Sequence, residues 1–144
     1  MRHLLALALM SASTIAIAAR DARFDYQMEC QGCHAADGGG TVASVPSLKD
    51  HVGKFLDVPG GREFLAQVPG AAQAPLDDTA LAQVLNFILR EIGHADGFAP
   101  YTADEVARLR RTPLTNVAAT RAALVREIEQ RSSAPQPPIV GRQR

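Results

Sequence analysis

The feature that most constrains this chain is the pentapeptide Cys30-Gln31-Gly32-Cys33-His34. Two thiols three residues apart can reach both vinyl groups of one haem and form thioether bonds with them. The histidine that follows directly is then held where its Nε2 atom meets the iron. We therefore predict that the chain folds around one covalent haem c, attached through Cys30 and Cys33, with His34 as the proximal axial ligand of the iron.

Three other uses of such a cysteine pair fit the sequence less well. A thioredoxin-like redox pair needs a βαβ scaffold, and the chain shows no strand pattern. A zinc site needs further ligands at suitable spacing, whereas His51 and His94 each stand alone. A structural disulfide between residues three apart closes too small a loop to stabilise the fold much.

The N-terminal residues have the pattern of a secretory signal peptide. Arg2 precedes an apolar run over residues 4–18, which ends in the small-x-small sequence Ala16-Ile17-Ala18. The run is too short to span the hydrocarbon core of a bilayer, and no later segment can do so. We expect residues 1–18 to be removed on export and the mature protein to lie, without a membrane span, in the periplasm of a bacterium.

The mature chain carries helical signals only, so we predict an all-α fold. In the best-defined segment, residues 78–92, apolar residues recur three and four positions apart. Asp77 or Asp78 can cap the start of this helix, and Gly93 can end it. No segment alternates apolar and polar residues as a strand does. Further helices are expected at residues 21–29, 49–58, 60–68, 102–112 and 116–131.

These elements divide into a haem domain, residues 19–96, a helical extension, residues 97–131, and a tail, residues 132–144, expected to be disordered. The haem domain contains six basic and eleven acidic side chains, whereas residues 97–144 contain eight basic and four acidic ones. Because the charges are opposite and the extension carries an apolar stripe, we expect it to fold back onto the haem domain. Docking onto a partner subunit and a solvated appendage are the alternatives.

Beyond the attachment motif, residues 22–92 resemble a class I c-type cytochrome. Tyr26 stands four residues before the first cysteine, where this family has an aromatic residue of its N-terminal helix. Pro46 and Leu48 match the family's Pro-x-Leu, twelve and fourteen residues after the haem histidine. Residues 86–88 resemble the aromatic-bearing segment that crosses the N-terminal helix.

The resemblance implies a cytochrome c-like haem domain of about four helices, followed here by a C-terminal helical pair. It also implies that Pro46 and Leu48 line the haem pocket. In this family the proline carbonyl accepts a hydrogen bond from Nδ1 of the proximal histidine, here His34, which fixes its tautomer. Residues 97–144 are not covered by the resemblance.

The chain departs from the family at the sixth iron ligand. Family members usually supply a methionine from the stretch that here spans residues 68–78, which contains none, and Met28 lies too close to Cys30 to reach the opposite face. His51 is the candidate distal ligand, because its segment borders the haem in this family. His94 is a more remote candidate, and an open sixth position is the third possibility.

Composition and charge restrict the function. The 15 basic and 15 acidic side chains form no polybasic run, which argues against binding to nucleic acid. We expect an electron carrier rather than an enzyme, either soluble or the cytochrome subunit of a periplasmic dehydrogenase or respiratory complex. Its redox partner would be a dehydrogenase or oxidase protein. An open iron would instead suit a protein that binds a small ligand, such as a gas sensor or haem enzyme.

Overall fold

The computed structural model describes residues 21–41, 45–49 and 51–134. Within these ranges every regular element is helical, and a single bridge between Thr41 and Val45 is the one β-type pairing. The predicted all-α fold is confirmed. Among the described residues, no helix has the length and apolar character that a membrane crossing requires. The expected signal peptide, residues 1–18, lies outside the described residues.

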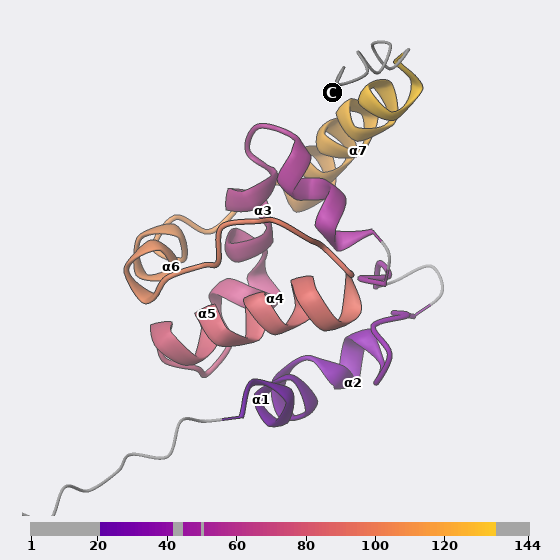
Figure 1. Ribbon diagram of the computed structural model, residues 1–144. Helices are drawn as coiled ribbons and strands as arrows, with labels where there is room; N and C mark the ends of the chain where they lie inside the picture. The colour runs from indigo at the N-terminus through magenta and orange to yellow at the C-terminus, as the bar shows by residue number, and fades with distance from the viewer. Residues whose placement is uncertain (1–20, 42–44, 50, 135–144) are drawn as a thin grey trace, which may run out of the picture.

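The helices follow one another along the chain, with the two longest connections before η1 and before α6 (Figure 1). Those of the haem domain are α1 Ala22–Glu29, α2 Gln31–His34, the 3-10 helix η1 Val52–Asp57, α3 Gly61–Gln67, α4 Pro69–Ala72, α5 Asp78–Phe87 and the π-helical turn η2 Ile88–Ile92. The extension contains α6 Ala103–Leu109 and α7 Val117–Ser133. Helix α7 therefore runs two residues into the tail that was expected to be disordered, and residues 135–144 lie outside the described part of the chain.

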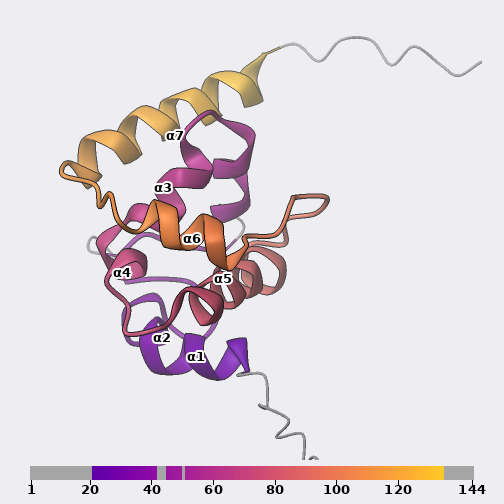
Figure 2. The same ribbon diagram turned by 90° about the vertical axis from the view of Figure 1, so that its left-hand side faces the viewer.

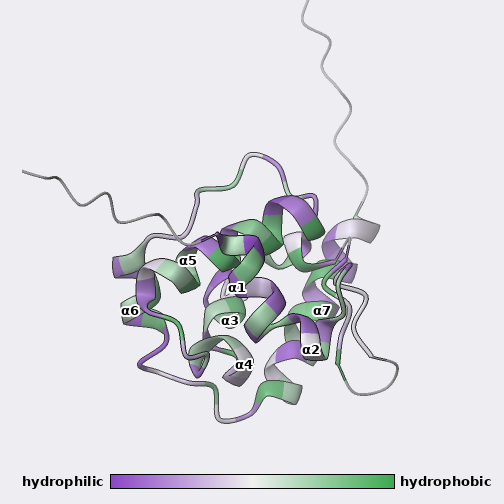
Figure 3. Cartoon of the chain, turned by 90° about the horizontal axis from the view of Figure 1, so that it is seen from below, coloured by the Kyte–Doolittle hydropathy of each residue, from purple (hydrophilic) through white to green (hydrophobic). Residues whose placement is uncertain are grey.

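Polar side chains define where the longer helices begin. The Asp77 carboxylate accepts a hydrogen bond from the Ala80 amide at 2.7 Å and starts α5. The Thr102 hydroxyl accepts one from the Glu105 amide at 3.2 Å and starts α6. The helices carry both hydrophobic and hydrophilic residues (Figure 3), and α5 buries most of its hydrophobic ones, among them Leu81, Val84 and Leu85.

Helix α1 packs across α5 and so fixes the position of the attachment motif (Figure 1). Tyr26 is 2% exposed, and its ring centroid lies 5.7 Å from that of Phe87. The Tyr26 hydroxyl donates a hydrogen bond to the Ala35 carbonyl at 2.7 Å. Because Ala35 directly follows the motif, this bond ties both ends of the motif to the core.

The extension packs against the rest of the chain, as Figure 2 shows for α6 beside α5 and for α7 above α3. Val106 of α6 and the preceding Tyr101 are buried in the same hydrophobic cluster as Tyr26 and the side chains of α5. Leu124 of α7 lies in a second cluster with Phe55, Val58 and Phe64. Helices of these lengths are marginal when isolated, so α6 and α7 are stabilised mainly by this packing.

Candidate haem site

The attachment motif forms one compact helical turn. Cys30 ends α1, and its carbonyl accepts hydrogen bonds from the amides of Cys33 at 3.2 Å and His34 at 3.0 Å. Ala35 then leaves the turn with a φ of +63°. The turn brings the two thiols and the imidazole to the wall of one cavity.

The loop that carries Pro46 is held against this turn by glycines. The Gly40 amide donates to the His34 carbonyl at 2.9 Å, and the Leu48 amide donates to the Gly38 carbonyl at 2.7 Å. Gly40 has a φ of +73°, and a Cβ atom there would clash with the Val45 carbonyl and with Pro46. Glycine at this position therefore allows Pro46 and Leu48 to approach the motif.

The cavity has a volume of about 360 Å³, which is within the usual range for sites that bind small molecules and cofactors. Its lining combines the motif and the Pro46 loop with residues from η1, α3, α4, α5, η2 and α7. Most of these side chains are apolar, among them Leu48, Phe55, Phe64, Leu65, Val68, Leu81, Val84, Leu85 and Leu89. A haem is a large, mainly apolar group, so the lining fits it, and the thiols and imidazole provide its points of attachment.

His34 is held as a neutral imidazole. Burial lowers its pKa below the ordinary value, and the backbone carbonyl of Pro46 opposes this effect more weakly. The Nδ1 atom is buried and lacks a partner within hydrogen-bond geometry, so the carbonyl lies nearby without completing the bond. The neutral ring is the form of histidine that binds a metal.

The environment of Cys30 does not suit a redox-active thiol pair. Burial, together with the nearby negative charges of Glu29 and Asp25, raises the pKa of Cys30 to about 11. Reactive Cys-x-x-Cys pairs instead have a lowered pKa, which provides the attacking thiolate. Both Cys30 and Cys33 are free thiols here, and Cys33 is exposed.

The structure does not bring His51 to the cavity that contains His34. The His51 side chain is exposed, and its Nδ1 atom lies 2.7 Å from the Lys49 carbonyl oxygen, because the residue turns outward just before η1. His94 lies in a separate, polar hollow between η1 and the segment after η2. Met28 is 63% exposed on α1 and does not line the cavity.

Three residues of the extension line the cavity, which the sequence did not indicate. Tyr101 precedes α6, and Val117 and Arg121 lie on the first turns of α7. Arg121 is the one cationic side chain among the described residues that line the cavity. No signal in the sequence distinguishes Arg121 from the other arginines of the extension, because its role depends on how α7 packs.

A covalent-haem motif at an apolar cavity in an all-α fold defines the class of c-type cytochromes. No family model matches the sequence. Two similar proteins, both from Thermus thermophilus, are named cytochrome c-552. One is 35% identical over 135 positions, which cover 79% of this chain and 89% of the relative. The other is 36% identical over 60% of this chain and 82% of its own length.

The chain belongs to the c-type cytochromes, and it is an electron carrier whose cofactor is haem c. The similarity also reaches further than the motifs suggested. Residues 1–96 make up two thirds of the 144 residues, so a match to 79% of the chain includes part of the extension. The resemblance seen in the motifs covers residues 22–92, whereas this relative also shares part of the extension.

Proposed function

We propose that the protein carries single electrons in the periplasm by means of one haem in the cavity beside α2. The observation that carries this proposal is that Cys30, Cys33 and His34 all line one apolar cavity of about 360 Å³. Export, inferred from residues 1–18, would place the chain where covalent haem attachment takes place. The redox partner is proposed to be a periplasmic or membrane-bound dehydrogenase or oxidase.

Each residue of the motif has a separate part. The thiols of Cys30 and Cys33 would hold the haem through its two vinyl groups, and Nε2 of His34 would bind the iron. The Pro46 carbonyl lies near Nδ1 of His34 and would accept a hydrogen bond from it once the haem is held, which would fix the ring and make it a better donor to the metal. Leu48 packs in the pocket and helps to exclude water. The haem supplies the one-electron chemistry, and the protein sets its potential through ligation and burial.

Arg121 is placed to pair with a haem propionate. Helix α7, which carries Arg121, lies at the opposite end of the molecule from α2 in both Figure 1 and Figure 2. Propionates project from the edge of a porphyrin opposite its vinyl groups, and the vinyl groups would be held at α2. Arg121 is half-buried at the cavity wall, so its guanidinium can reach this edge.

The proposed function is tested by exporting the full chain in a host that has a haem-attachment system. We expect haem stain to remain with the polypeptide on a denaturing gel of the periplasmic fraction, and the purified protein to cycle reversibly between oxidised and reduced spectra. A chain that starts at residue 19 and stays in the cytoplasm is the control and should carry no stain. Haem that runs at the dye front in the exported sample would contradict the proposal.

A further inference from the structure

One wall of the cavity offers no group that could bind the iron. This wall consists of α3, α4 and the segment after them, and its lining residues are Phe64, Leu65, Val68, Pro69, Gly70, Ala71 and Ala74. Haem iron is bound in proteins by histidine, cysteine, methionine or tyrosine side chains. None of these residue types occurs in this wall, so it cannot provide a sixth ligand.

Three other lining residues, Ser47, Tyr101 and Glu29, carry side-chain oxygen atoms but are not placed to bind the iron. The Ser47 hydroxyl donates a hydrogen bond to the Gly38 carbonyl at 3.3 Å. The Tyr101 hydroxyl donates a hydrogen bond to the Arg62 carbonyl at 2.6 Å, and burial raises its pKa, so the phenolate form is not available at neutral pH. Glu29 directly precedes Cys30 and is therefore confined to the attachment side of the cavity. With His51 turned outward, the described cavity lining contains no second ligand opposite His34.

A guanidinium from the extension holds this wall in place. Arg110, at the end of α6, donates hydrogen bonds to the carbonyls of Ala72 at 3.1 Å, Ala74 at 2.9 Å and Leu76 at 2.8 Å. It also forms an ion pair with Asp78 at 3.1 Å. One side chain thus fixes the backbone over residues 72–76. This segment lies within residues 68–78, the stretch that corresponds to the usual position of the methionine in the class I cytochromes that the chain resembles.

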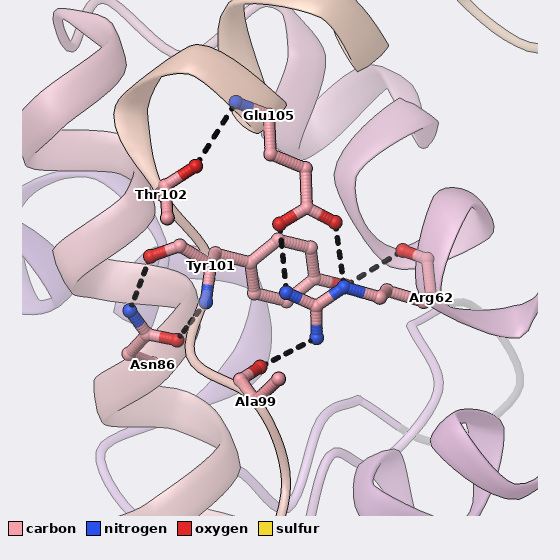
Figure 4. Close-up of polar contacts among 6 residues, drawn as sticks. All are labelled: Arg62, Asn86, Ala99, Tyr101, Thr102 and Glu105. Carbon is pink, nitrogen blue, oxygen red and sulfur yellow. Dashed lines mark hydrogen bonds and ion pairs between the residues drawn. The ribbon is translucent and has the colours of Figure 1, made fainter.

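A second network fixes α3, the other part of the wall (Figure 4). The Arg62 guanidinium binds both carboxylate oxygens of Glu105, at 2.6 and 2.7 Å, and lies 4.0 Å from the centre of the Tyr101 ring. Asn86 of α5 in turn exchanges two hydrogen bonds with the backbone of Tyr101. Bidentate pairs of this kind have a defined geometry, so the position of α3 is tied to α5 and α6.

We propose that the sixth position of the haem iron is open to a small uncharged diatomic molecule, such as carbon monoxide or nitric oxide, and that Arg110 acts as a positioning residue that keeps it open. The apolar wall favours an uncharged ligand, because it offers no partner to a buried charge. Arg110 prevents the wall from collapsing onto the iron, since it fixes three carbonyls of residues 72–78. The inference rests on the haem attachment proposed above.

The test is the addition of carbon monoxide to the reduced, haem-loaded protein. We expect a five-coordinate, high-spin spectrum before the addition and a rapid change of the main absorption band after it. A low-spin spectrum that carbon monoxide leaves unchanged, on a chain that retains its haem, would overturn the inference but not the proposed function. If His51→Ala then opened the iron to carbon monoxide, His51 would be the ligand. A chain without covalent haem would instead contradict the proposed function itself.

The role of Arg110 is tested by the association rate of carbon monoxide. Arg110→Lys keeps the charge but cannot make all the hydrogen bonds to the three carbonyls and the ion pair with Asp78. We therefore expect carbon monoxide to associate about tenfold more slowly, a change typical of the loss of strong hydrogen bonds. Folded Arg110→Ala protein should show the same slower association of carbon monoxide. Arg111→Ala, which changes the exposed neighbouring arginine, is the matched control and should match the wild type. A variant at Arg110 that melts earlier but binds at the wild-type rate would overturn the positioning role.

Discussion

At the scale of single residues, burial decides what the groups of the site can do. It lowers the pKa of His34, which keeps the ring neutral and able to bind iron, and it raises the pKa of Cys30 to about 11, which keeps the thiol protonated. Both shifts have desolvation as their largest cause. The same apolar surroundings thus favour metal binding by the imidazole and suppress thiol exchange by the cysteine.

The first prediction concerns the thiol of Cys30 before haem is attached. In the haem-free Cys33→Ser variant, alkylation of Cys30 should need a higher pH than alkylation of an ordinary thiol, because only the thiolate reacts. The rate should reach half its maximum near pH 11. A pH series with an alkylating reagent measures this value, with the unfolded variant as the control. A midpoint at or below the ordinary value of 9.0 would contradict the account.

The second prediction concerns Arg121 and the potential of the haem. Removing a cation beside a propionate stabilises the oxidised, more positive state, so Arg121→Gln should lower the midpoint potential. A partly exposed ion pair contributes up to about 1 kcal/mol, which corresponds to roughly 40 mV for one electron. Arg126→Gln, on an exposed position of the same helix, is the control. Equal potentials for the wild type and both variants in a redox titration would show that Arg121 does not face the propionates.

At the scale of elements, the extension is part of the haem site. Helix α6 carries Val106 into the central core, and its Glu105 binds Arg62 of α3. Helix α7 covers Phe55 and Phe64, whose rings stack with centroids 5.3 Å apart. The two helices therefore hold two walls of the cavity, η1 and α3, from outside.

The third prediction concerns the pair between Glu105 and Arg62. The hydrogen bonds from Arg62 hold the pKa of Glu105 below its ordinary value of 4.5. A lowered folded-state pKa contributes stability that is present above pH 4.5 and is lost as the pH falls through the folded-state value. The wild type should therefore be more stable than Glu105→Gln at neutral pH, and the difference should shrink in acid.

Thermal unfolding of both proteins between neutral and acidic pH measures this difference. Asp104→Asn changes the exposed neighbouring acid and is the matched control. A stability difference between the wild type and Glu105→Gln that does not change with pH would show that the ion pair is not its cause.

Local signals made the helices predictable, and long-range contacts made the rest of the site unpredictable. Asp77 starts α5 as its cap position predicts, since a cap acts on residues two or three positions away. The contacts of Arg110 join residues at least 32 positions apart and end mainly on backbone carbonyls, which leave no mark in the sequence. The orientation of His51 was likewise open, because it depends on where η1 begins.

At the scale of the whole molecule, opposite charges and a shared core join the extension to the haem domain. The expected attraction is seen in the pair of Arg110 with Asp78, and Arg131 of α7 donates to the Asp57 carbonyl at 2.8 Å. In a further ion pair the charges are reversed, because the basic residue, Arg62, lies in the haem domain and the acidic one, Glu105, lies in the extension. The chain contains no tryptophan and only 5% aromatic residues. A porphyrin in the cavity would therefore supply much of the large aromatic surface of the core.

The central claim is that one haem is bound covalently through Cys30 and Cys33. Intact mass spectrometry of the exported protein under denaturing conditions tests it most directly. We predict a single species whose mass equals the chain cleaved after Ala18 plus one haem, and a Cys30→Ala, Cys33→Ala double variant whose mass is that of the polypeptide alone. A wild-type mass equal to the polypeptide alone, from cells that attach haem to another c-type cytochrome, would contradict the account.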